Sequence, residues 1–130
     1  MKKLIALLFV VVSISGCIGI ATVGSVMYYK SQHHEVASVD IKAPANNVYN
    51  AVLNAVEGNS NIVLVNQDDV AMLVDLRQNE NDGSIKVREL SAKLSQLIIT
   101  SGLTAENETT PLMAVLKICK DLKVECKQSQ

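Results

Sequence analysis

The chain has 130 residues and a formal net charge of −1, and its length is typical of a single domain. Its twelve basic and thirteen acidic residues are interspersed, which excludes the basic stripe that nucleic-acid binding needs. There is no Trp, and the one Phe, Phe9, lies in an apolar run near the N-terminus. Any core further along the chain must therefore be aliphatic.

The first 17 residues have the features of an export signal. Lys2 and Lys3 form a positive n-region, and Leu4 to Val12 is wholly apolar but too short alone to span about 30 Å of hydrocarbon. Ile14-Ser15-Gly16-Cys17 follows and resembles the lipobox of bacterial lipoproteins. The resemblance implies a signal peptide over residues 1–16, cleavage before Cys17 and attachment of lipid to that cysteine.

An uncleaved transmembrane helix is the alternative reading of this segment. No residue from Leu4 to Tyr29 is charged, and these 26 residues are enough to cross a bilayer. Glycines interrupt the run, however, and Ser and Thr dilute its second half. In the lipoprotein interpretation, residues 17–29 form a lipidated tether that lies in the membrane interface or serves as a stalk. Residue 18 is Ile rather than Asp, which favours the outer membrane.

A strand and a helix are predicted after the tether. Glu35 to Ile41 alternates apolar and polar residues, as in a strand with one buried face. Asn46 or Asn47 is the expected N-cap of a helix in which apolar residues recur at helical spacing as far as Val56, before Gly58.

Four more strands and a second helix complete the predicted domain. The strands are expected at 62–65, 70–77, 85–89 and 91–100, with a turn at 79–83. Thr110 before Pro111 predicts the start of the last helix. We therefore expect residues 30–130 to form one α+β domain of order β-α-β-β-β-β-α, an antiparallel sheet of about five strands packed against two helices.

The two cysteines that follow Cys17 are candidates for a disulfide. Cys119 and Cys126 would lie about 10.5 Å apart along the axis of one continuous helix. A disulfide needs Cα atoms within about 7 Å, so it requires the helix to end between them and the tail to fold back. Two free thiols are the alternative.

Chemistry-bearing patterns are scarce in this sequence. It has no nucleophile elbow and no Gly-rich phosphate loop, and its one histidine pair, His33-His34, has no well-spaced further ligands. We therefore expect no catalytic residue, no metal site and no cofactor. Six apolar residues either fill the core or line an apolar cavity beneath the last helix. They are Met72, Val74, Leu76, Leu112, Met113 and Leu116.

The lipobox, the small-residue stretch after it and the segment Ala43 to Val52, of pattern AP-x-x-x-V-Y-x-A-V, together resemble a family of small bacterial lipoproteins of unknown function. Within it the chain is most similar to a Francisella lipoprotein described as a virulence determinant, whose soluble part resembles the helix-grip fold of birch-pollen allergens. Our first hypothesis is a non-enzymatic envelope protein, held on a membrane through Cys17, that acts through its surface on an envelope or host protein. An apolar, lipid-like small molecule is the alternative ligand.

Overall fold

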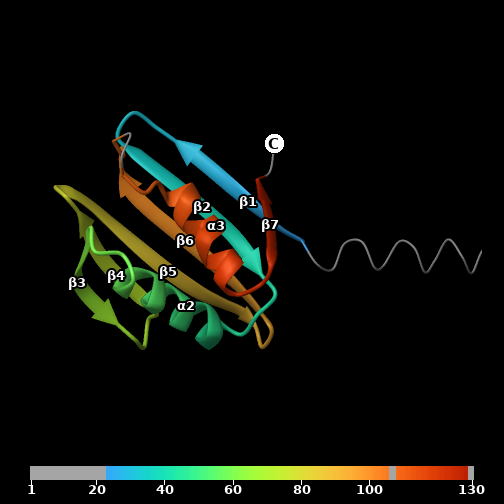
Figure 1. The fold of residues 1–130 in the computed structure, drawn as a ribbon. Coiled ribbons are helices and arrows are strands. Elements are labelled where there is room, and N and C mark those ends of the chain that lie inside the picture. The colour runs from blue at the N-terminus through green and yellow to red at the C-terminus, as the bar shows by residue number, and fades with distance from the viewer. Residues whose placement is uncertain (1–22, 106–107, 129–130) are drawn as a thin grey trace, which may run out of the picture.

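The computed structural model describes residues 23–105 and 108–128 (Figure 1). Seven strands and two helices make up this part of the chain. In chain order they are β1 (Val23–Lys30), β2 (His34–Ile41), α2 (Ala45–Glu57), β3 (Ile62–Asp68), β4 (Leu73–Gln78), β5 (Asn81–Ser91), β6 (Leu94–Gly102), α3 (Pro111–Asp121) and β7 (Glu125–Gln128). Neither helix is long and apolar enough to cross a membrane.

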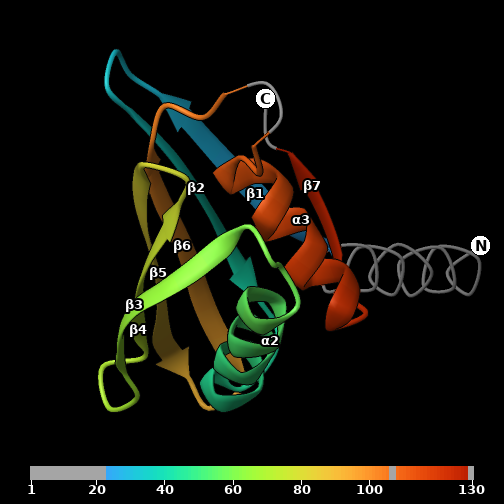
Figure 2. The same ribbon diagram turned by 60° about the vertical axis from the view of Figure 1, so that its left-hand side comes forward.

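One sheet runs through the described domain, with the strand order β3-β4-β5-β6-β2-β1-β7. Every neighbouring pair is antiparallel except β1 and β7, which are parallel. Both helices lie on the same side of this sheet, with α3 across β2 and β6 (Figures 1 and 2). The predicted α+β class, an antiparallel sheet packed against two helices, is confirmed. The sheet has two strands more than the five expected.

The core lies between the helices and the inner face of the sheet. Alternate residues of β2 and β6, such as Ala37, Val39 and Leu97, are buried there because side chains alternate between the two faces of a strand. Val48 and Val52 of α2 are fully buried against them. The predicted aliphatic core is confirmed, and burial of each Val, Leu or Ile side chain contributes about 1.5–3 kcal/mol.

Strand β1 occupies residues that were expected to belong to the tether. Residues 26–30 pair with β2 and residues 23–26 with β7, so residues 23–29 of the predicted tether lie in the sheet. Val26 and Tyr28 face inward, whereas Met27 and Tyr29 are about two-thirds exposed on the other face. Because apolar and aromatic residues occupy both faces, the strand lacks the polar alternation that would have revealed it.

The two helices begin differently: a side chain caps the N-terminus of α3 but not that of α2. Pro44 is the N-cap of α2 and no side chain caps it, so the expected Asn46 or Asn47 cap is wrong. The cap of α3 is as predicted, with the Thr110 hydroxyl oxygen accepting a hydrogen bond from the Met113 N–H at 3.1 Å. The turn expected at residues 79–83 is shorter, because β5 already begins at Asn81.

The chain reverses after α3 and closes a disulfide. Lys123 adopts φ = 61°, a left-handed conformation that lets the chain turn back, and the Val124 N–H donates to the Cys119 carbonyl at 3.0 Å. The Cα atoms of Cys119 and Cys126 lie 6.1 Å apart, and their sulfurs are bonded. The sequence left open whether Cys119 and Cys126 form a disulfide or remain free thiols, and in the structure they form the disulfide. The bridge links β7 to α3, and β7 pairs in parallel with β1.

Candidate functional site

The six residues expected to line an apolar cavity do not gather around one space. Val74 is fully buried in the core, and Met72, Leu76 and Leu112 pack against that core while half-buried. Met113 and Leu116 face solvent on α3, with exposed fractions of 55% and 39%. The prediction that these six residues line one cavity is therefore wrong. Two of them lie on the exposed face of α3, and the other four belong to the hydrophobic core or pack against it.

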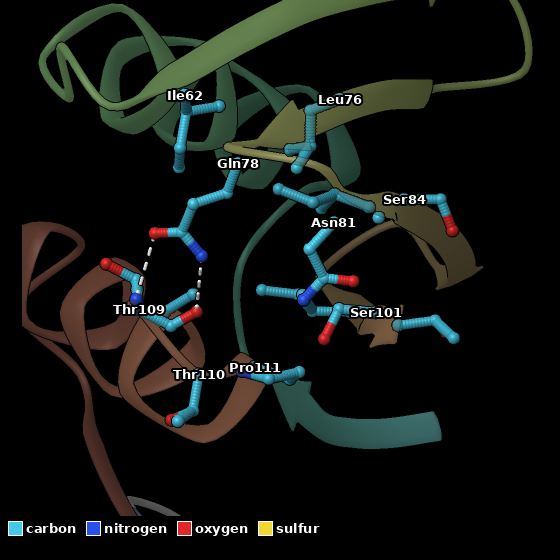
Figure 3. Close-up of a pocket in the computed structure, with 14 residues that line it drawn as sticks. Ile62, Leu76, Gln78, Asn81, Ser84, Ser101, Thr109, Thr110 and Pro111 are labelled. Atoms are coloured by element: carbon cyan, nitrogen blue, oxygen red, sulfur yellow. Dashed lines mark hydrogen bonds between the residues drawn. The ribbon is translucent and has the colours of Figure 1, made fainter. Parts of the chain in front are cut away.

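A smaller pocket lies between the sheet and the N-terminal end of α3 (Figure 3). Its volume is about 50 Å³. That is room for a few water molecules, whereas sites for drug-sized ligands need about 300 Å³ or more. Leu76 is the one residue of the predicted set that lines it. The remaining walls include Ile62, Gln78, Asn81, Ser101 and Pro111.

Polar side chains at this pocket close the loop after β6. The Gln78 amide nitrogen donates to the Thr109 carbonyl at 3.1 Å, and the Thr109 N–H donates to the Gln78 amide oxygen at 2.9 Å (Figure 3). The Asn81 amide donates to the carbonyls of Gly102 and Leu103, each at 3.2 Å. These groups bind the protein backbone, so they hold the loop and do not present themselves to a ligand.

Glu35 is the buried carboxylate of the described domain, with 2% of its surface exposed. Its two oxygens accept hydrogen bonds from the Tyr28 hydroxyl at 2.6 Å, the Thr104 N–H at 2.7 Å and the Thr104 hydroxyl at 2.6 Å. Burial alone would raise the pKa of Glu35, but the bonds from Thr104 and Tyr28 outweigh it and the pKa lies below its ordinary value. The carboxylate ties β1, β2 and the loop after β6 together.

A second carboxylate joins α2 to the turn after β3. The Tyr49 hydroxyl donates to Asp69 at 2.7 Å, and the Gln67 amide donates to the same oxygen at 2.6 Å. Burial and then the bond to Asp69 raise the pKa of Tyr49 to about 12. The bond to Glu35, followed by burial, raises the pKa of Tyr28 to about 12. Both phenols are hydrogen-bond donors that hold the fold.

Within residues 23–105 and 108–128, no three His, Cys, Asp or Glu side chains come together in a way that could hold a metal. His33 and His34 are exposed at the β1–β2 turn, where their backbone N–H groups donate to the Ser31 hydroxyl oxygen at 3.4 and 3.1 Å. Cys17, the predicted lipidation site, and the signal segment before it lie outside the described residues.

Strand β3 carries an exposed apolar surface that the sequence analysis did not predict. Val63, Leu64 and Val65 are exposed by 62%, 45% and 57%. A groove of about 300 Å³ runs between β3 and α2, with Leu53, Val56, Ile62 and Leu64 among its walls. We call it the α2–β3 groove. The signal in the sequence was the run Ile62 to Val65, which has neither a charge nor a proline.

Comparison with known proteins leaves the family open. No family model matches the chain, and no curated protein matches it. Among solved structures, the chain is similar to the Zhui aromatase/cyclase from Streptomyces sp. R1128, with 14% identity and a TM-score of 0.43. The match covers 69% of this chain and 86% of that one. A likeness at this level does not define a shared activity.

Proposed function

We propose that this chain is a bacterial lipoprotein: a non-enzymatic domain that is held on a membrane by lipid on Cys17 and acts through its surface. The observation that carries the proposal is the order of the first 17 residues. A positive start, an apolar run of signal-peptide length and the segment Ile14 to Cys17 follow each other as lipoprotein processing requires. The two or three acyl chains of a lipoprotein cysteine exceed the single chain that gives only marginal membrane binding.

The start of the folded domain is consistent with a short anchor. Strand β1 begins at Val23, six residues after Cys17. Six residues reach at most about 20 Å when fully extended. The domain would therefore lie close to the membrane surface, and β1 would be its first strand after the anchor. We propose the outer membrane, because residue 18 is Ile and not Asp, and an envelope or host protein as partner, with a role in virulence that rests on the family resemblance.

Cys17→Ser tests the anchor. Cells producing the wild-type chain are fed an alkyne-bearing fatty acid, and the extracted protein is coupled to a dye. The wild type is expected to label and to fractionate with membranes, and Cys17→Ser is expected to lose the label. Cys126→Ser is the matched control, because it removes a cysteine that lies in the folded domain. Equal labelling of wild type and Cys17→Ser would overturn the proposal.

The outer-membrane assignment has a separate test. Ile18→Asp changes only the residue after the lipidated cysteine, and we expect it to move the protein from the outer to the inner membrane fraction on a density gradient. A wild-type protein already found in the inner membrane would contradict the assignment while leaving lipidation intact.

A carrier of an apolar small molecule is the second candidate, and the structure favours it less. The pocket under α3 holds about 50 Å³, far below the volume that a lipid-like ligand needs. Native mass spectrometry of the protein released from mild detergent distinguishes the two. A carrier would retain a ligand of defined mass, whereas a protein that acts through its surface is expected to give the mass of the lipidated chain alone.

A further inference from the structure

Strand β3 is an open edge of the sheet. It pairs with β4 on one side, and in the part of the chain that the structure describes no strand pairs with its other side. Such an edge presents N–H and C=O groups that another strand can bind. Natural edges are usually protected by lysine, proline or a bulge. This one has neither lysine nor proline between Ile62 and Asp68, and its bulge lies at Val65.

The α2–β3 groove lies directly beside this edge. Leu53 and Val56 of α2 form one wall, and Ile62 and Leu64 of β3 form the other. Because side chains of a strand alternate between faces, a strand added to β3 would direct every second side chain into this groove. Backbone pairing at the edge and side-chain pockets in the groove are the two parts of recognition by strand addition.

The α2–β3 groove lies in an acidic part of the chain, and this charge favours one kind of binding partner. From Ala43 to Leu76 the chain has no Lys, Arg or His and carries four carboxylates. Glu57 lines the groove where β3 begins, and Asp68 and Asp69 stand where β3 ends. The groove has aliphatic walls, with Asn59, Ser60 and Gln67 also lining it, and carboxylates lie near both ends of β3. It therefore complements an apolar segment with basic ends.

A second copy of this chain fits less well. Antiparallel pairing of two β3 edges would place Asp68 and Asp69 of one copy beside Glu57 of the other, which repels. The bulge between Leu64 and Asn66 also limits the regular edge to a few residues, and two copies would meet two bulges. A short segment from another protein can pair with Ile62 to Leu64 alone.

We propose that the α2–β3 groove binds an extended segment of a partner protein by strand addition, with aliphatic side chains at alternate positions and Lys or Arg at the ends. The inference deepens the proposed function by naming the surface through which the anchored domain acts. β3 and β7 are opposite edges of the sheet, and β1, which follows the anchor, adjoins β7. The groove is thus far from the strand that leads to the membrane and open to a partner.

The test uses the full chain in detergent micelles and a panel of dye-labelled nine-residue peptides. Each peptide has lysine at both ends, threonine at alternate positions, and valine, isoleucine, leucine or phenylalanine at the three positions between. Fluorescence anisotropy is expected to show saturable binding of at least one peptide. Hydrogen exchange is expected to slow within residues 62–64 of β3 when that peptide binds, because its backbone then pairs with this part of the strand.

Two variants separate groove binding from adhesion to apolar surface. Leu64→Lys places a charge in the groove and is expected to weaken binding at least about tenfold, a loss of about 1.4 kcal/mol. Leu90→Lys is the matched control: Leu90 of β5 is exposed by 45%, the same fraction as Leu64, and does not line the groove, so binding should be unchanged. Glu57→Lys leaves the apolar walls in place and should weaken binding severalfold. Replacing the peptide's two lysines with glutamates should do the same.

Three outcomes would overturn the proposal. No peptide of the panel binds below about 1 mM, or Leu64→Lys and Leu90→Lys bind equally well, or exchange at β3 slows with rising protein concentration in the absence of peptide. The last result would identify a second copy as the occupant. None of them bears on fatty-acid labelling at Cys17, so failure of the groove and failure of the anchor are distinguishable.

Discussion

Replacing Glu35 with alanine removes the carboxylate that joins β1, β2 and the loop after β6. The Thr104 N–H, the Thr104 hydroxyl and the Tyr28 hydroxyl would each lose an acceptor at 2.6–2.7 Å. A hydrogen bond to a charged group contributes about 1.5–3 kcal/mol, and the cost of burying the charge offsets part of the sum. We expect Glu35→Ala to lower the free energy of unfolding by about 3 kcal/mol.

The effect of Glu35 depends on pH in a defined direction. The pKa of Glu35 in the folded protein lies below its ordinary value of 4.5. Above pH 4.5 the carboxylate is ionised in both states and its full contribution to stability is present. As the pH falls below that value, the unfolded chain takes up the proton first, and the contribution is lost. The difference in stability between wild type and Glu35→Ala should therefore be largest near pH 7 and shrink in acid.

Thermal unfolding followed by circular dichroism at pH 7 and pH 3.5 measures both effects. For a domain of about 100 residues, 3 kcal/mol corresponds to a fall in Tm of roughly 15 °C. Glu35→Gln is the control of similar volume without charge, and its Tm should lie between those of wild type and Glu35→Ala. A Tm for Glu35→Ala within a few degrees of wild type at pH 7 would refute the reasoning, and so would an equal difference at both pH values.

Three further predictions concern the disulfide, the two hydrogen-bonded tyrosines and the Gln78 side chain. Cys126→Ser opens the disulfide to Cys119, and since the bridge spans only seven residues we expect a loss of about 2 kcal/mol in denaturant unfolding with faster hydrogen exchange in β7. Tyr28 and Tyr49 should ionise near pH 12 in a spectrophotometric titration, and stability should fall as the pH rises from 10 towards 12, because the folded state holds these protons more tightly. Gln78→Leu removes both bonds to the loop after β6 and should cost about 2 kcal/mol, measured by urea unfolding.

Each of these predictions has a result that would count against it. Unchanged stability of Cys126→Ser under oxidising conditions would show that β7 does not depend on the bridge. Release of both phenolic protons near pH 10 would remove the case for buried Tyr28 and Tyr49 hydrogen bonds. A Gln78→Leu protein as stable as wild type would mean that the apolar side chain repays the lost bonds by filling the pocket.

The elements that were predictable from the sequence are those with one polar face. β2 alternates from Glu35 to Ile41, and α3 begins with Thr110 and Pro111, so local rules sufficed. β1 was hidden because Met27 and Tyr29 give its outer face the same apolar character as its inner face. β7 is only four residues long, three of them polar, and it pairs with a strand about 100 residues earlier and is held by a disulfide, neither of which a local pattern contains.

The candidate site was harder to predict than the fold. A list of apolar residues on two elements did not distinguish those that fill a core, such as Val74, from those that face solvent, such as Met113, because that distinction depends on how α3 rotates against the sheet. Likewise, the run Ile62 to Val65 reads as an interior strand, and only the sheet order shows that it is an edge. The proposed anchor at Cys17 rests on a different kind of signal, since the lipobox pattern consists of adjacent residues.

The central claim is that Cys17 is the first residue of the mature protein and carries lipid. Intact-mass measurement of the protein extracted from membranes tests it most directly. The account predicts a chain of residues 17–130 whose mass exceeds that of its amino acids by a diacylglycerol, with or without a further acyl chain. A chain that still begins at Met1, or one cut at another position without added lipid, would contradict it.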